Sequence, residues 1–315
     1  STGLARHFTR FGGMWSLKRE WRAGVPESGN TSAPTPISWL EIDASGTLLA
    51  VALYRQVLVW DLRGHYITHA LRLSKHKRAL MQTSAQSAET SVMGPVQLVR
   101  FHPSKSWLAA SDQTGAIWVW DLHLARSHQD PDNKAPPLAI LSNHMSAVTD
   151  LHMFESRAQG GTQHWLVSVS RDRVISLWRL EDCKLINTVT SYESMEALVV
   201  LARDAPVVRE RWPGHIGDIV LTGGERGVLR AFDTCLKTDQ GANLFSEPSS
   251  DHVHGIDYML ANTSRDELIV ITNDQNIAIY SLNTLTRTRV ITGFNDEVID
   301  MAYLDQGQSL VAATN

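Results

Sequence analysis

The sequence predicts an all-β fold made of a repeated four-stranded unit. Apolar segments recur that end in an aromatic residue, and these residues follow one another at intervals of 60, 58, 54 and 48 positions: Trp60, Trp120, Trp178, Phe232 and Tyr280. The apolar runs are short, rich in β-branched side chains and bounded by Gly, Pro, Asp and Ser, as in LLAVAL (48–53). Such runs are typical of strands, and we find no 3.6-residue pattern long enough for a helix.

A repeat of four short antiparallel strands is typical of a β-propeller blade. We predict five complete blades, at about 36–73, 95–141, 144–190, 193–245 and 252–291. Half-blades flank them, at 1–30 with the last two strands of a blade and at 296–315 with the first two. The halves either pair into a sixth, composite blade, which would remove two exposed sheet edges, or are completed by residues outside this sequence.

The intervals exceed an ordinary blade because of insertions. Residues 74–94 are polar, rich in Ser, Gln and Ala, and lack periodicity, which predicts a mobile loop. Three further segments are expected to be surface excursions: 123–137, 155–163 and 203–217. Extra residues belong in loops, because an insertion within a strand would turn its buried face outward.

Composition narrows the class of protein. Of the 315 residues, 43% are hydrophobic and 20% charged, which predicts a globular core. The net charge of −4 argues against a chain that wraps nucleic acid as a polycation, and no apolar run is long enough to span a membrane. The beginning, STGLARHFTR, has no apolar signal segment, so we expect no secretion. Two cysteines, Cys183 and Cys235, favour a reducing intracellular compartment over a disulfide scaffold.

One set of polar residues stands out in the third complete repeat. His144 precedes its first strand, Ser168 lies in the second, Asp172 in the following turn and Trp178 in the third strand. A Ser–His–Asp hydrolase uses the same residue types, but no GxSxG elbow is present. We therefore predict a buried structural network within the blade, in which Asp172 accepts hydrogen bonds and Trp178 donates its indole N–H.

The other repeats depart from this pattern. The turn position of Asp172 is taken by Thr114 in the second repeat and by Arg226 in the fourth, and the first repeat has a shortened turn with Tyr54 and Arg55. We therefore expect the complete polar network in the third blade alone, and we expect the other blades to be held together by apolar packing.

Arginines recur in the turns between the second and third strands: Arg55, Arg171, Arg173 and Arg226. Guanidinium groups gathered on one face would suit an acidic peptide or RNA phosphates. The alternative is that each arginine is individually solvated. No motif for a metal, a cofactor or catalysis stands out, so the sequence predicts a protein that is not an enzyme.

Trp-Asp pairs at 60–61 and 120–121, with degraded copies in the other repeats, resemble WD40 repeats over nearly the whole chain. A collinear succession of segments across residues 8–315 resembles more specifically the first half of the family of transducin β-like protein three, the thirteenth of the U3 small nucleolar RNA-associated proteins in yeast nomenclature. The segments of this sequence that carry the resemblance include VQLVRFHP (96–103), HMSAVTDL (144–151), SRDRVISLW (170–178), GGERGVLRAFD (223–233) and GFNDEVIDMAYL (293–304).

This resemblance implies a nucleolar, non-catalytic scaffold of the UTP-B subcomplex in the small-subunit processome, which supports pre-rRNA processing and 18S rRNA maturation. The implied partners are protein subunits of that ribonucleoprotein and, further, pre-rRNA or U3 RNA, with no membrane and no small-molecule substrate. The family has two tandem propellers and a C-terminal helical domain, and the chain is expected to end as the second propeller begins. A generic WD40 platform in another complex and a direct RNA-binding module remain as alternatives.

Overall fold

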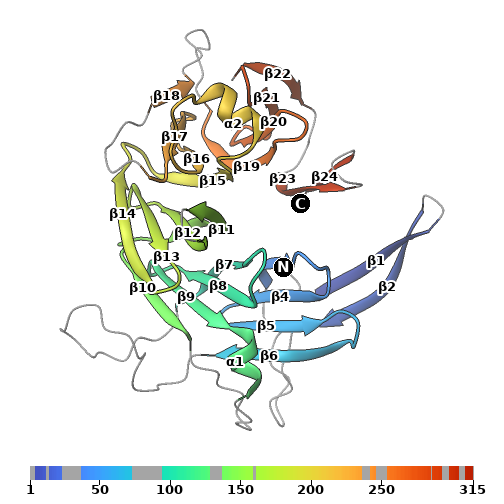
Figure 1. The fold of residues 1–315 in the computed structure, drawn as a ribbon. Helices are drawn as coiled ribbons and strands as arrows, with labels where there is room; N and C mark the ends of the chain where they lie inside the picture. The colour runs from blue at the N-terminus through green and yellow to red at the C-terminus, as the bar shows by residue number, and fades with distance from the viewer. Residues whose placement is uncertain are drawn as a thin grey trace. The chain divides into compact units, whose positions relative to one another are not determined.

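The computed structural model describes residues 4–11, 14–22, 37–72, 94–127, 137–158, 161–235, 242–245, 254–284, 286–292, 298–304 and 309–314. The chain divides into two compact units, Ser1–Asn143 and His144–Asn315. Strands dominate both units in Figure 1, and within each sheet every strand pairs with its neighbour in the sequence.

The described part of the first unit contains one two-stranded sheet and two four-stranded antiparallel sheets. The two-stranded sheet consists of β1 (Leu4–Phe11) and β2 (Met14–Arg22). The first blade consists of β3 (Ile37–Ile42), β4 (Leu48–Leu53), β5 (Gln56–Asp61) and β6 (Tyr66–Arg72). The second blade consists of β7 (Val96–Phe101), β8 (Trp107–Asp112), β9 (Ala116–Asp121) and β10 (Ala139–Ser142), with α1 (Leu122–Ser127) following β9.

In the second unit, the residues that the structure describes form three four-stranded sheets and one two-stranded sheet. The third blade consists of β11 (Val148–Ala158), β12 (Gly161–Ser170), β13 (Val174–Arg179) and β14 (Lys184–Thr190). The fourth consists of β15 (Met195–Leu201), α2 (Pro206–Arg211), β16 (Ile219–Gly224), β17 (Leu229–Asp233) and β18 (Ala242–Phe245). The fifth consists of β19 (Ile256–Asn262), β20 (Glu267–Thr272), β21 (Ile277–Ser281) and β22 (Arg287–Ile291), and β23 (Val298–Leu304) pairs with β24 (Ser309–Thr314).

The predicted fold class is confirmed. Among the described residues, five antiparallel sheets of four strands and two of two strands correspond to the five blades and two half-blades expected from the repeat. Pairing of the two half-blades into one composite blade stays a prediction.

A β-bulge recurs at one place in the repeat. The first strand of every blade, and β23 of the last half-blade, shifts register directly after its first residue, between these pairs: Ile37/Trp39, Val96/Leu98, Val148/Asp150, Met195/Ala197, Ile256/Tyr258 and Val298/Asp300. A bulge bends a strand and increases its twist. The same irregularity at the same position marks the blades as copies of one structural unit.

The turn between the second and third strands also recurs in the second to fifth blades. Its fourth residue donates a backbone hydrogen bond to the carbonyl of the first, at 2.8–3.2 Å, and has a positive φ in each case: Gly115 (92°), Arg173 (69°), Gly227 (68°) and Gln275 (64°). Glycine adopts this left-handed conformation without steric cost, whereas a side chain crowds the backbone. The first blade has the shorter turn Tyr54–Arg55, because Leu53 pairs with Gln56.

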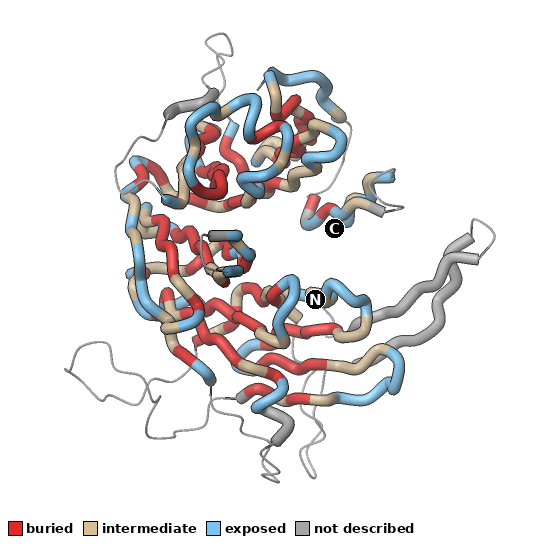
Figure 2. Tube along the Cα trace, viewed as in Figure 1, coloured by how far each residue is buried: buried red, intermediate tan, exposed pale blue. Residues whose placement is uncertain are grey.

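Burial follows strand position within a blade. The second and third strands are mostly buried, as in β8 and β16, whereas the fourth strands β14 and β22 are largely exposed (Figure 2). A strand whose two faces are both covered needs apolar residues in succession instead of alternation. This explains runs such as LLAVAL in β4.

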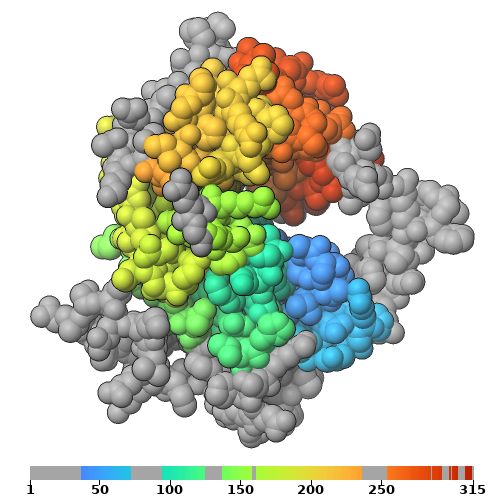
Figure 3. Space-filling model, viewed as in Figure 1, coloured from blue at the N-terminus to red at the C-terminus, as the bar shows by residue number. Residues whose placement is uncertain are grey.

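Apolar cores join neighbouring blades within each unit. In the first unit, Trp118 and Trp120 of β9 are 1% and 0% exposed and pack with Ala52 and Val59 of the first blade. In the second unit, residues of the fourth and fifth blades form one core. At the surface, these two blades adjoin where yellow meets orange in Figure 3. Another core in this unit contains Val169 and Ile175 of the third blade and extends to Leu198 of the fourth blade.

Two sequence-based expectations need correction. The chain is not free of helix, because α1 and α2 are helices of six residues each. Residues 203–217 are not only a surface excursion, since Val207 and Val208 of α2 are buried and belong to the core of the fourth and fifth blades. Residues 155–163 fit the expected surface excursion: their described part belongs to the paired ends of β11 and β12, which prolong a hairpin, and its side chains are exposed or partly buried.

Residues 74–93 of the predicted mobile loop lie outside the described residues. Within the described part of the chain, neither helix has the length and apolar character needed to cross a membrane.

Candidate functional site

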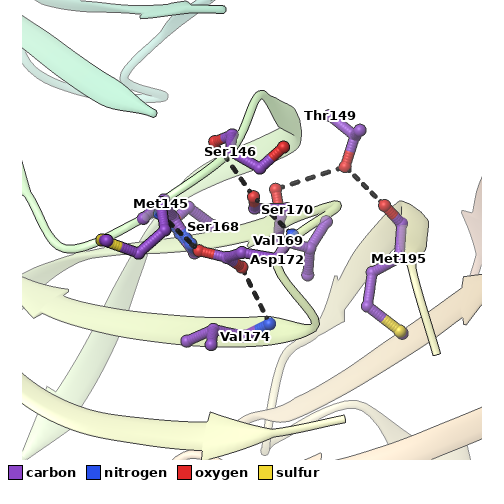
Figure 4. A network of polar contacts seen from close by, with 10 residues as sticks. Met145, Ser146, Thr149, Ser168, Val169, Ser170, Asp172, Val174 and Met195 are labelled. Carbon is purple, nitrogen blue, oxygen red and sulfur yellow. Dashed lines mark hydrogen bonds and ion pairs between the residues drawn. The ribbon is translucent and has the colours of Figure 1, made fainter. Parts of the chain in front are cut away.

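The third blade holds a buried network centred on His144. Its Nδ1 lies 3.1 Å from Oδ2 of Asp172, and its Nε2 lies 2.8 Å from Oγ of Ser168. Asp172 also accepts hydrogen bonds from the backbone N–H groups of Met145 at 2.8 Å and Val174 at 2.9 Å, both shown in Figure 4. The network therefore ties the loop before β11 to β12 and to the turn that leads into β13.

The electrostatics of this network favour a neutral imidazole. Burial lowers the pKa of His144 below its usual value of 6.5, although the neighbouring Asp172 carboxylate opposes this shift. A neutral ring that donates from Nδ1 to the carboxylate can accept at Nε2 from the Ser168 hydroxyl, which satisfies all three groups. The geometry is that of a Ser–His–Asp set, but Ser168 is 0% exposed, so no substrate can reach its hydroxyl.

Trp178 does not join the network. The structure brings His144, Ser168 and Asp172 together, whereas the buried Nε1 of Trp178 has no hydrogen-bond partner among the described residues. Trp178 instead contributes apolar burial, since it is 4% exposed on β13.

The second blade has its own carboxylate network, which the sequence analysis missed. Asp112, at the end of β8, is 0% exposed. It accepts hydrogen bonds from Nε1 of Trp118 at 3.1 Å, Oγ1 of Thr114 at 2.6 Å and three backbone N–H groups, of Gly94, Thr114 and Ala116. The residue at the turn position that corresponds to Asp172 is Thr114, two residues further on. The signal that could have found Asp112 is the turn sequence Asp-Gln-Thr-Gly, because Asp readily caps such turns.

The fourth blade uses a glutamate from the preceding loop. Oε2 of Glu193 accepts a hydrogen bond from the backbone N–H of Arg226 at 2.6 Å, and Oε1 lies 3.3 Å from Nη2 of Arg230. Arg230 also donates from Nη1 to Oγ of Ser191 at 2.7 Å. A carboxylate thus holds this turn although no acidic side chain occupies the turn position that Asp172 has in the third blade.

The four candidate arginines all lie in the predicted turns and are exposed. The guanidinium of Arg55 lies 5.3 Å from the centre of the Tyr54 ring. Arg171 forms a two-pronged ion pair with Glu196, at 2.9 and 3.3 Å. Arg173 and Arg226 make no ion pair within the described ranges of the chain. Arg173 and Arg226 therefore fit the predicted binding of an acidic partner better than Arg171, whose charge is already paired with Glu196.

Blades with this shared bulge, this shared turn and carboxylate networks at the turn define the chain as a WD40-type β-propeller protein. No protein-family model matches the chain. Among curated proteins it is similar to transducin β-like protein 3 of Mus musculus, with 29% identity over 303 residues that cover 94% of this chain and 33% of the relative.

The same protein of Homo sapiens is 29% identical over 282 residues, which cover 89% of this chain and 30% of the relative. Transducin β-like protein 3 of Bos taurus is 29% identical over 290 residues, which cover 89% of this chain and 31% of the relative. These matches confirm the resemblance to transducin β-like protein 3. The chain spans about a third of the length of these relatives.

Proposed function

We propose that this chain is part of a non-catalytic WD40 scaffold that binds protein subunits of the small-subunit processome and supports pre-rRNA processing and 18S rRNA maturation. The observation that carries the proposal is the similarity to transducin β-like protein 3 over 94% of the chain. The resemblance extends through the degenerate blades as well as those with a Trp-Asp pair, which makes it more specific than a likeness of fold.

The buried networks support a structural role for the residue types that catalysis would use. Ser168 and Asp112 are fully buried, and the side chain of His144 is 0% exposed. Their hydrogen bonds fix loops to strands, which is what a rigid platform needs. The loops of the third and fourth blades expose Met145, Tyr192, Arg173 and Arg226, whose residue types are enriched at interfaces.

The proposal includes location and partners. A scaffold of this kind would reside in the nucleolus through assembly with UTP-B subunits, and pre-rRNA or U3 RNA would be associated with the same particle. A WD40 platform in a different complex is the competing assignment.

Affinity purification of the tagged full-length protein tests the proposal. Recovery of U3 RNA together with UTP-B subunits is the expected result. Recovery of signalling proteins without U3 RNA would assign the chain to another WD40 complex and overturn the proposal.

A second candidate function, direct contact with RNA phosphates, draws on the exposed Arg173 and Arg226. Each phosphate that a protein neutralises releases counterions, so such binding weakens steeply as salt rises. Titration of labelled pre-rRNA fragments at low and moderate salt separates the two functions. Absence of binding at low salt would rule out RNA contact by these residues.

A further inference from the structure

Two exposed apolar side chains and two exposed arginines lie on connected loops of the third and fourth blades. Met145 precedes β11 and is 90% exposed, and Tyr192 precedes β15 and is 71% exposed. Arg173 and Arg226 occupy the turns that lead into the third strands of the same two blades. We call these four residues the Met145–Tyr192 surface.

Hydrogen bonds hold the loops of this surface side by side. Met145 donates its backbone N–H to Asp172, which is adjacent to Arg173. The backbone N–H of Ser191, the residue before Tyr192, donates to the carbonyl of Arg173 at 2.6 Å. Arg226 donates its backbone N–H to Glu193, the residue after Tyr192, at 2.6 Å. The four residues therefore form one continuous surface whose backbone is fixed before a partner arrives.

The side chains of this surface point outward while their supports are buried. In Figure 4 the side chain of Met145 is directed away from Asp172. Tyr192 has the guanidinium of Arg230 5.8 Å from its ring centre, and Arg230 is itself held by the buried Glu193. An exposed aromatic ring on a rigid support loses little entropy on binding, as interface anchors do.

Charge distinguishes an acidic peptide from a nucleic acid as the partner. The loops expose Arg171, Arg173 and Arg226, but carboxylates lie among them: Glu225 is exposed next to Arg226, and Glu196 of β15 pairs with Arg171. A phosphate backbone needs a groove of continuous positive potential, which these carboxylates interrupt. Separate guanidiniums beside an apolar side chain instead suit individual carboxylates, which Arg binds through paired hydrogen bonds.

We infer that the Met145–Tyr192 surface binds a short protein segment in which apolar side chains alternate with Asp or Glu. Apolar side chains of that segment would cover Tyr192 and Met145, and its carboxylates would pair with Arg173 and Arg226. The inference deepens the scaffold role proposed above and rests on it, because it names the class of partner that one face of the scaffold takes.

Fluorescence titration of the full-length protein with a labelled peptide of alternating Leu or Phe and Asp or Glu tests the inference. Matched probes are the same peptide with Lys in place of the acidic residues, and oligouridine. Saturable binding of the acidic peptide, with affinity reduced about tenfold by Tyr192→Ala and by the double substitution Arg173→Gln/Arg226→Gln, is expected. Tyr66→Ala is the control, because Tyr66 is a comparably exposed tyrosine, 55%, in the first unit.

Equal affinity for the acidic and basic peptides, unchanged affinity in Tyr192→Ala, or tighter binding of oligouridine would each overturn the inference. The melting temperature of each variant shows that it is folded. The outcome is separable from that of the affinity purification: failure of the wild-type protein to recover U3 RNA and UTP-B subunits counts against the proposed function, whereas failure of the peptide titration counts against the partner class alone.

Discussion

Arg230 and Glu193 form an ion pair of 3.3 Å whose side chains are 10% and 1% exposed. The carboxylate comes from the loop before β15 and the guanidinium from β17, so the pair spans the fourth blade. Oε1 of Glu193 is held by charge without an aligned hydrogen bond, while Oε2 accepts the N–H of Arg226. The pair closes the turn that presents Arg226.

Removal of one partner of this pair is expected to be much more harmful than removal of both. Glu193→Ala leaves a buried guanidinium uncompensated and should cost about 3–5 kcal/mol of unfolding free energy. The double variant Glu193→Leu/Arg230→Met replaces the pair by apolar side chains and should recover most of that loss. Chemical denaturation measures both, and an equal loss in the single and double variants would contradict the assignment of a coupled pair.

Asp172→Ala should destabilise the protein by about 1–3 kcal/mol, because His144 and the N–H groups of Met145 and Val174 lose their acceptor. The control is Asp182→Ala, which breaks the ion pair of Asp182 with Arg179 at 2.6 Å, where both side chains are about one-third exposed. A surface ion pair contributes little to the free energy of unfolding, so the melting temperature of Asp182→Ala should change less than that of Asp172→Ala. An unchanged melting temperature in Asp172→Ala would remove the network assignment.

Asp112→Ala should be at least as destabilising, by about 2–4 kcal/mol, since several donors around a fully buried carboxylate lose their partner at once. Trp118→Phe separates packing from hydrogen bonding: it retains most of the apolar contact and removes the indole N–H, for an expected loss of about 0.5–1.5 kcal/mol. Thermal and urea unfolding of the two variants provide the comparison. A larger loss in Trp118→Phe than in Asp112→Ala would show that packing of the indole, and not the carboxylate, dominates this turn.

Stability should fall on acidification through His144. Its pKa is lowered in the folded protein, so below the usual value of 6.5 the unfolded chain takes up a proton that the folded chain does not. This contribution is present in full above that value and is lost as the pH falls toward the folded-state pKa. His144→Gln should flatten the dependence of melting temperature on pH below 6.5 relative to wild type. Parallel curves for the two proteins would indicate that His144 does not titrate differently in the folded state.

The strand pattern and the repeat could be predicted from the sequence because they depend on local information. Apolar runs such as LLAVAL have the length and composition of strands, and the aromatic ends of the third strands recur every 48 to 60 residues, which indicates a repeat. The spacing of His144, Ser168 and Asp172 likewise follows from the repeat. Their meeting in the structure needs only that one blade forms.

The residues that sequence reasoning missed depend on spatial neighbours or on orientation. Glu193 meets Arg230 only after β15, β16 and β17 have paired, and no local pattern links the two. The turn sequence that follows Asp112 indicates a capping role, but its hydrogen bond with Nε1 of Trp118 depends on the direction of the indole ring, which no local pattern specifies. Val207 and Val208 are buried because they pack in a core that includes residues of the fifth blade. The polar residues around them in the same insertion hide this burial from a reading of the sequence.

Arg173 occupies the turn position at which the second and fourth blades have glycine, with a φ of 69°. Arg173→Gly would relax the backbone there, and a protein engineer who ranks variants by heat resistance alone would keep it. That exchange would also delete a guanidinium that stands ready for a carboxylate. At this single position, a substitution that raises thermal stability would weaken the recognition of other proteins.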